Sequence, residues 1–145
     1  MKISTKGKNA IKLMLDLATY NNGEPVSVKD IAKRQGISEK YLEQIISMLN
    51  KASLVKSVRG AHGGYVLNYS PEKYTVGKIL RAVEGDLSST DCVGENGIRC
   101  ENKSTCASYR LWEKLDAAVN GVLDGFTLAD MMDWQSELQG DDYVI

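Results

Sequence analysis

The sequence predicts a mainly α-helical fold with one small β-hairpin, followed by a long C-terminal helix. Apolar residues recur at helical spacing over most of the chain, and capping residues mark the starts of successive segments. One stretch, residues 54–70, instead reads as two strands joined by a glycine-rich turn. The 145 residues fit one domain with an appendage. We therefore expect three parts: residues 1–85, a cysteine-containing loop at 86–107, and a helical region at 108–145.

Three helices are expected before the hairpin. The first begins at a cap formed by Ser4 or Thr5. The second begins with a capping box of Ser27 and Asp30, because the hydroxyl and the carboxylate can satisfy backbone N–H groups that are free at a helix start. The third begins at Ser38, and the short turn RQGIS joins it to the second. Two helices joined in this way form a helix-turn-helix, although a hairpin of helices that only pack together has the same pattern.

The hairpin at residues 54–70 favours the helix-turn-helix. Gly60, Gly63 and Gly64 permit a tight reversal between its strands. A hairpin directly after a helix-turn-helix makes a winged helix, in which the hairpin is the wing. Arg59 and His62 lie at the predicted tip of the wing, where they could reach phosphate or the minor groove of DNA.

The charge distribution also points to a nucleic acid. Residues 1–81 carry 14 Lys and Arg against 6 Asp and Glu, a net charge of +8. Residues 82–145 carry 4 against 13, a net charge of −9. Solvated faces can differ by chance, but so sharp a split in one small chain favours a basic half that meets a polyanion. The sequence contains no catalytic triad or phosphate-binding loop and only one histidine, so we do not expect an enzyme.

The third helix has two faces. One carries an apolar stripe that must face a core: Tyr41, Leu42, Ile45, Ile46 and Leu49. The other carries Lys40, Glu43, Gln44 and Ser47, which are available to DNA. Glutamine can pair with adenine, and glutamate can accept from cytosine N4 while it repels phosphates and base acceptors. Glu43 is therefore either a discriminating residue or an ordinary solvated acid.

All three cysteines, Cys92, Cys100 and Cys106, lie in the segment CVGENGIRCENKSTC. The N-terminus lacks the apolar core of a signal peptide and no run is long enough to span a membrane, so we expect a cytoplasmic protein with reduced thiols. The thiols could be metal ligands, form a redox switch or have no role. Spacings of seven and five residues let a loop wrap an iron–sulfur cluster. Structural zinc more often uses short Cys pairs and a fourth ligand, so an iron–sulfur site is favoured over zinc or thiol redox chemistry.

The acidic half contains a strongly apolar helix. Its stripe is broad: Leu111, Trp112, Leu115, Val119, Val122 and Leu123. Such a helix packs either within the chain or against a second subunit. Thr127 and Asp130 are expected to cap a last helix.

Several separate motifs occur in the order found in one known family: MKISTKG, DIAKRQGIS, YLEQ, LVKSVRGAHGGYVL, TVGKILRAVEG and GVLDGFTLADM. On these motifs the chain resembles the winged-helix regulators that include IscR, NsrR, RirA and CymR. The resemblance implies a homodimeric transcription regulator that binds double-stranded promoter DNA and pairs through its long C-terminal helix. YLEQ matches the recognition-helix motif of IscR, and Arg59 matches the wing arginine. The predicted DNA-binding residues are Ser38, Lys40, Tyr41, Glu43, Gln44, Ser47, Arg59 and His62.

The resemblance also bears on the cysteines. Cluster-binding members place three cysteines between the wing and the dimerisation helix, where this chain has its own three. In IscR the fourth ligand is a histidine three residues after the last cysteine, but here that residue is Tyr109. In NsrR it is an acidic residue near the start of the first helix, where this chain has Lys8 and Asn9. A [2Fe–2S] cluster is favoured and a [4Fe–4S] cluster is possible. The fourth ligand stays open among an external thiol, water and these side chains: Asn9, Asp91, Glu95, Glu101 and Tyr109.

The sequence thus predicts an iron–sulfur-dependent, DNA-binding regulator of iron–sulfur cluster biogenesis or of iron or sulfur metabolism. A repressor of the same fold that senses nitric oxide or redox state is the alternative. A small iron–sulfur electron carrier fits less well, because it leaves the basic helix-turn-helix half without a role. No membrane partner is expected.

Overall fold

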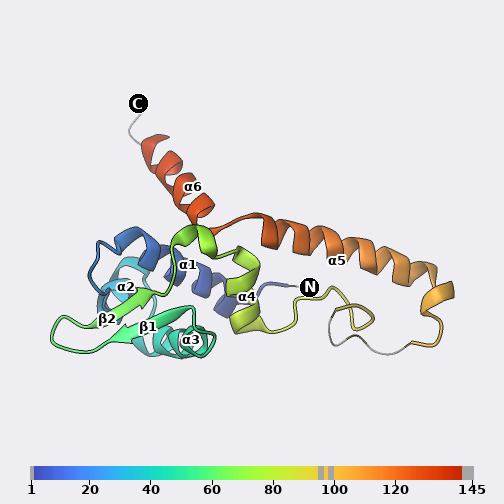
Figure 1. Ribbon diagram of the computed structural model, residues 1–145, viewed down its shortest axis with the longest axis horizontal. Coiled ribbons are helices and arrows are strands. Elements are labelled where there is room, and N and C mark those ends of the chain that lie inside the picture. The colour runs from blue at the N-terminus through green and yellow to red at the C-terminus, as the bar shows by residue number, and fades with distance from the viewer. Residues whose placement is uncertain (1, 95–96, 98–99, 142–145) are drawn as a thin grey trace.

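A winged helix-turn-helix and a projecting helix dominate the computed structural model, which describes residues 2–94, 97 and 100–141 (Figure 1). The elements before the cysteine loop are α1 (Thr5–Tyr20), α2 (Val28–Gln35), α3 (Glu39–Lys51), β1 (Val55–Val58), β2 (Gly64–Leu67), the 3₁₀ turn η1 (Pro71–Lys73) and α4 (Val76–Glu84). After the loop come η2 (Lys103–Thr105), α5 (Ala107–Gly125) and α6 (Leu128–Asp141). The prediction of a mainly α fold with a small β-hairpin is confirmed.

One hydrophobic core lies beneath the helix-turn-helix. α1 passes through its centre and buries Leu13, Met14 and Leu17 completely. α2 contributes only Ile31, whereas α3 buries a full stripe on one face. Leu128, the first residue of α6, is also fully buried in this core, so α6 packs against α1. The winged unit therefore includes the beginning of the last helix.

The helices begin at the residues that the sequence predicts. The Ser4 hydroxyl, rather than that of Thr5, accepts the capping hydrogen bond of α1. Ser27 and Ser38 cap α2 and α3 in the same way. At α6 the capping box is reciprocal, because the Thr127 N–H donates to Asp130 and the Asp130 N–H donates to the Thr127 hydroxyl.

The wing is an antiparallel pair in which Val55 lies opposite Leu67 and Val58 opposite Gly64. β2 has a second neighbour that the sequence does not reveal. Val26, just before α2, exchanges two backbone hydrogen bonds with Tyr65, at N···O distances of 3.0 and 2.8 Å. A side chain at Gly64 would overlap the Val26 carbonyl, so glycine is required where the wing approaches the start of α2.

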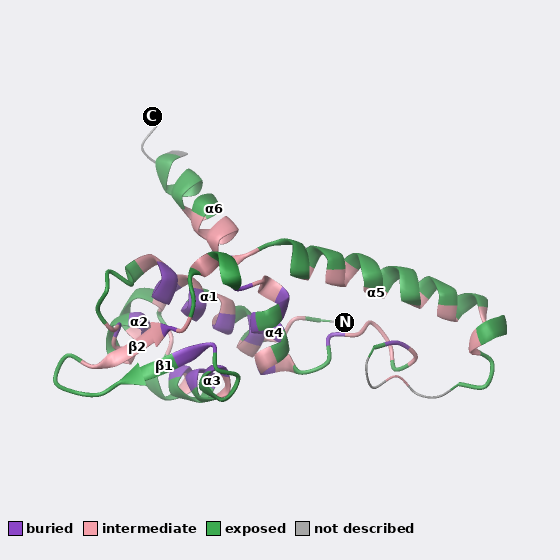
Figure 2. Ribbon diagram, in the orientation of Figure 1, coloured by how far each residue is buried: buried purple, intermediate pink, exposed green. Residues whose placement is uncertain are grey.

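The segment after α4 leads away from the winged unit, and α5 returns from the far end toward it (Figure 1). No residue of α5 is buried (Figure 2). At its C-terminal end the helix is tied to α4 through the backbone, because the Val76 N–H donates to the Phe126 carbonyl and the Leu128 N–H to the Tyr74 carbonyl. No helix in the described part of the chain is long and apolar enough to cross a membrane.

Candidate DNA interface and cysteine loop

The two faces of α3 are as predicted. Leu42, Ile45, Ile46 and Leu49 are buried against α1 and α2, which turns the opposite face outward. That face carries four exposed side chains: Lys40, Glu43, Gln44 and Ser47. Ser38 is exposed as well, and its hydroxyl accepts from the Tyr41 N–H at 3.2 Å to cap the helix.

Tyr41 differs from the other predicted DNA contacts on α3. Its side chain is half-buried and packs against the hydrophobic core. The buried part of the ring anchors the first turn of α3, so only its exposed part is available to DNA.

Both predicted wing residues are exposed. Arg59 directly follows β1, and His62 lies in the turn between the strands. Gly60 adopts a φ of 123°, which a side chain would strain, and its carbonyl accepts from the Gly63 N–H at 3.0 Å. This turn brings a cation and an imidazole to the end of the hairpin, where they can approach a polyanion.

A buried tyrosine hydroxyl holds the base of the wing to the end of α3. The Tyr74 hydroxyl donates to the Leu54 carbonyl at 2.7 Å and accepts from the backbone N–H groups of Asn68 and Tyr69. Burial raises the pKa of Tyr74 above its ordinary value, against the opposing effect of these two N–H groups. Sequence reasoning missed this residue, because nothing in the pattern shows which groups meet the hydroxyl.

An ion pair with a buried carboxylate holds α2, which has only one fully buried apolar residue. The carboxylate of Asp16, with no side-chain exposure, accepts from the Arg34 guanidinium at 2.8 and 3.0 Å and from the Gln35 amide at 2.9 Å. Arg34 also lies over the Tyr20 ring, 3.9 Å from its centroid. The hydrogen bond and charge of Asp16 raise the pKa of Arg34, against the opposing effect of burial. Nothing in the sequence pattern indicates this ion pair either.

All three cysteines are free thiols. Cys92 and Cys106 are half-buried and Cys100 is exposed. Cys106 occupies the N-cap of α5, where its sulfur accepts from the Tyr109 N–H at 3.4 Å. The N-terminus of a helix favours negative charge, so this position suits a sulfur that serves as a thiolate ligand.

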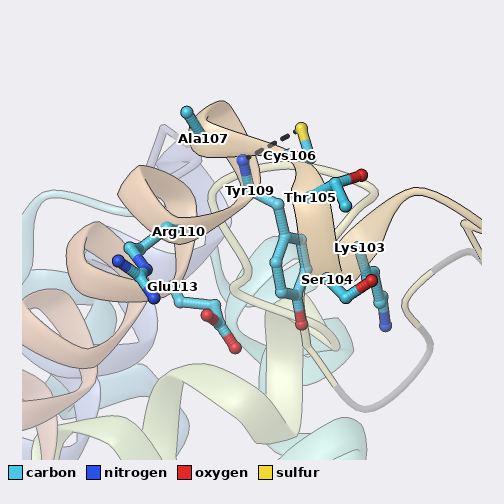
Figure 3. Close-up of a pocket in the computed structure, with 8 residues that line it drawn as sticks. All are labelled: Lys103, Ser104, Thr105, Cys106, Ala107, Tyr109, Arg110 and Glu113. Atoms are coloured by element: carbon cyan, nitrogen blue, oxygen red, sulfur yellow. Dashed lines mark hydrogen bonds between the residues drawn. The ribbon is translucent and has the colours of Figure 1, made fainter.

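Two hollows adjoin Cys106 and Cys92. The first, of about 660 Å³, is lined by Cys106 and residues of η2 and the first two turns of α5 (Figure 3). The second, of about 280 Å³, is lined by Cys92 and Asp116 among others. Lys103, Tyr109 and Glu113 line both hollows and therefore lie between the two thiols.

The candidate fourth ligands are not assembled around the sulfurs. Figure 3 shows the Cys106 sulfur and the Tyr109 hydroxyl at opposite ends of the group, and the Lys103 ammonium lies 5.1 Å from the centre of the Tyr109 ring. Asp91 and Glu101 are exposed, and Asn9 is half-buried on α1. Glu95 lies outside the described residues. Within the described chain, no three His, Cys, Asp or Glu side chains form a group that could hold a metal ion.

The chemistry of the donors nevertheless fits an iron–sulfur cluster. The loop offers three reduced thiols as ligands, and Cys106 lies at the helix N-terminus. Gly94 has a φ of 96° and its carbonyl accepts from the Gly97 N–H, so the chain bends sharply beside Cys92. A structural zinc site would need a fourth side chain, and the only histidine, His62, lies on the wing.

The chain is similar to known transcription regulators over nearly its whole length. The family model described as Rrf2, iron-dependent transcriptional regulator, matches residues 3–134. The HTH-type transcriptional regulator IscR of Aliivibrio salmonicida is 42% identical over 91% of this chain and 77% of its own length. IscR of Serratia proteamaculans is 39% identical over 95% and 83%.

Solved structures agree with these sequence matches. CymR of B. subtilis, described as the global cysteine regulator of that bacterium, superposes with a TM-score of 0.78 at 42% identity, over 92% of this chain and 98% of its own. IscR of T. potens gives a TM-score of 0.78 at 43% identity, over 96% and 91%.

Proposed function

Because the chain belongs to the Rrf2 family of transcriptional regulators, a non-enzymatic and DNA-binding family, we propose that it is a homodimer whose binding to promoter DNA depends on an iron–sulfur cluster held by Cys92, Cys100 and Cys106. The observation that carries the proposal is the place of the thiols. They lie on the loop that joins a winged helix-turn-helix to a long projecting helix. A ligand bound there contacts the two elements whose relative position matters for DNA binding.

On the DNA side, α3 enters the major groove with Lys40, Glu43, Gln44 and Ser47 toward the bases, while Ser38 and the exposed part of Tyr41 lie at its first turn. Arg59 and His62 contact phosphate or the minor groove from the wing. The exposed, outward orientation of these side chains supports this arrangement. So does the net charge of +8 over residues 1–81.

The dimer forms through α5. Leu111, Leu115 and Val122 are 56%, 43% and 59% exposed along this helix, which buries no residue of its own. A monomer rarely leaves such an apolar stripe in water. A second copy of α5 covers it in the proposed dimer, and the two recognition helices then read a palindrome.

An iron–sulfur cluster is redox-sensitive and chemically labile, so loss of the cluster can serve as the signal to which the regulator responds. The side chains hold it through three thiolates, with the Cys106 sulfur fixed at the α5 N-cap by the Tyr109 N–H. A [2Fe–2S] cluster with a non-cysteine fourth ligand is the form we favour. Its regulatory targets are genes of cluster biogenesis or of iron or sulfur metabolism.

One observation favours a second candidate signal. Cys100 is exposed, and the protein offers only three thiols, so an incomplete thiolate set leaves the cluster open to small reactive molecules. A repressor that senses nitric oxide or redox state uses the same fold and the same residues.

Single substitutions of the cysteines test the ligand assignment. Each of Cys92→Ser, Cys100→Ser and Cys106→Ser, purified without oxygen, should lose most of the visible absorption and of the bound iron and sulfide. Ser104→Ala changes another exposed side chain of the same loop and should keep both. If all three cysteine variants retain the parent's chromophore, the assignment is wrong.

A further inference from the structure

A polar ladder joins α5 to α4 and to the stem of the cysteine loop. Its members on α5, Asp116, Asn120 and Asp124, are four residues apart and so share one face of the helix. Asp116 accepts from the Ser89 N–H at 3.2 Å, on the loop, and from the Asn120 amide at 3.2 Å. Asn120 in turn accepts from the Arg81 guanidinium, on α4, at 2.8 Å.

Arg81 forms the strongest contact of this ladder. Its two terminal nitrogens donate to the two carboxylate oxygens of Asp124 at 2.6 and 3.1 Å, which is a bidentate pair with a fixed orientation. The hydrogen bond from Arg81, together with its charge, lowers the pKa of Asp124. We call Arg81, Asn120 and Asp124 the α4–α5 clamp.

A glycine on α4 makes room for this clamp. A methyl group at Gly77 would overlap the Asp124 carboxylate and come within 2.6 Å of the Arg81 guanidinium. Gly77 lies in the first turn of α4, where glycine still forms helix less readily than alanine. Helix formation therefore does not explain the glycine at this position. The close approach of the Asp124 carboxylate explains it, because a side chain would occupy the same space.

Small rotations of α5 have large effects at its far end. The helix has 19 residues and spans about 28 Å. Within the described residues, backbone hydrogen bonds join the chain to the winged unit just after the C-terminal end of α5, at Phe126 and Leu128. A tilt of about 10° around that end moves the other end by about 5 Å, which exceeds the rise of one base pair, about 3.4 Å.

From these contacts we infer that the α4–α5 clamp sets the spacing of the two half-sites that the protein reads. The inference rests on the proposed homodimer, in which α5 of each subunit carries one winged unit. Arg81, Asn120 and Asp124 are positioning residues that touch no DNA. They hold α5 at one angle to its own winged unit, and that angle fixes the separation of the two recognition helices.

The experiment is a selection from a DNA pool in which two copies of the preferred half-site are separated by spacers of every length from zero upward. The parent should enrich one spacer. Arg81→Lys, which keeps the charge but lacks the bidentate fork, and Asp124→Asn should accept neighbouring spacers, with the preference for the best spacer reduced about fivefold. Gly77→Ala should do the same although it favours the helix. Asp133→Asn removes an exposed acid from α6 and should leave the preference unchanged.

The half-site sequence, the dimer mass and the melting temperature separate positioning from unfolding. All three should stay close to the parent's in every variant, because an exposed ion pair contributes little to stability. If the clamp variants and Gly77→Ala keep the parent's sharp spacer preference, the inference is wrong and the proposed dimer stands. If the parent itself selects single half-sites, the proposed dimer is wrong and the inference fails with it.

Discussion

At the level of single residues, we propose that the exposed side chains of α3 select the DNA sequence, while a few buried polar groups hold the surrounding elements in place. Glu43 is exposed on the same face of α3 as Lys40, in a half-chain of net charge +8, where a carboxylate weakens attraction to phosphate. An acid in that place is explained best by a role in rejecting bases that present acceptors.

Glu43→Ala should therefore relax base selection more than it lowers affinity. The loss of a contact to cytosine N4 is worth about 1–3 kcal/mol at one base pair, whereas removal of a negative charge improves binding to every sequence. Binding-site selection with parent and variant measures the difference. Glu39→Ala, which removes an exposed acid from the first turn of the same helix, is the control. An identical selected motif for parent and Glu43→Ala would remove Glu43 from the readout.

Tyr74 is a buried residue whose hydroxyl holds the base of the wing. Tyr74→Phe leaves the Leu54 carbonyl and two backbone N–H groups without their partner and should lower the free energy of unfolding by about 2 kcal/mol. Tyr69→Phe removes the hydroxyl of an exposed tyrosine beside it and should cost little. Chemical denaturation of both variants measures the effect, and equal stabilities would contradict it.

Tyr74 also predicts a dependence on pH. Because burial raises its pKa in the folded state, its contribution is fully present below about pH 10, the ordinary tyrosine value, and is lost as the pH rises through the higher folded-state pKa. Tyr74→Phe should therefore show a smaller loss of stability in the alkaline range than the parent. The free energy of unfolding of the Tyr69→Phe variant should follow the same pH dependence as that of the parent. If the pH dependence of the Tyr74→Phe variant is also the same as the parent's, ionisation of Tyr74 does not affect stability.

At the scale of elements, the short helix α2 shows how an ion pair can replace a hydrophobic face. It has eight residues and fully buries only Ile31, with Val28 and Ala32 partly buried, so the pair of Asp16 and Arg34 adds a polar anchor to α1. Removal of Asp16 takes away its charge-assisted hydrogen bonds to Arg34 and Gln35, while the partly exposed Arg34 can still be solvated.

Asp16→Ala should lower the free energy of unfolding by about 2 kcal/mol and speed hydrogen exchange in α2 more than in α3. Arg34→Lys should have a smaller effect in the same direction, because lysine keeps the charge without the planar fork. Asp133→Ala, at an exposed position of α6, is the matched control. Uniform acceleration of exchange across α2 and α3 would mean that Asp16 stabilises the core as a whole rather than α2.

At the level of the whole molecule, local sequence patterns predicted the helices and the hairpin, but they did not predict the contacts between residues that are far apart in the sequence. The caps at Ser27, Ser38 and Thr127 follow from side chains that reach backbone groups three residues away, so the sequence contains the complete signal. The two faces of α3 follow from helical periodicity in the same way.

The pairs that join elements could not be predicted, because a charge or hydroxyl in a sequence does not say what it meets after folding. Asp16 and Arg34 are 18 residues apart, and Arg81 and Asp124 are 43 apart. Leu128 enters the core of the winged unit although the sequence groups it with the C-terminal region. The cysteine site is a prediction from spacing and resemblance, and neither of these determines how the three thiols are arranged in space.

We propose that one group in the cysteine loop controls DNA binding by the whole molecule. The most direct test of this proposal is the operator affinity of one anaerobic preparation, measured at one salt concentration before and after removal of the cluster. A regulator of this kind should change its affinity for at least one operator by about tenfold, within the usual coupling of about 1–3 kcal/mol. The Cys92→Ser/Cys100→Ser/Cys106→Ser variant should bind as the cluster-free parent does. Equal affinities of the loaded and cluster-free protein for every operator that it binds would contradict cluster-dependent regulation.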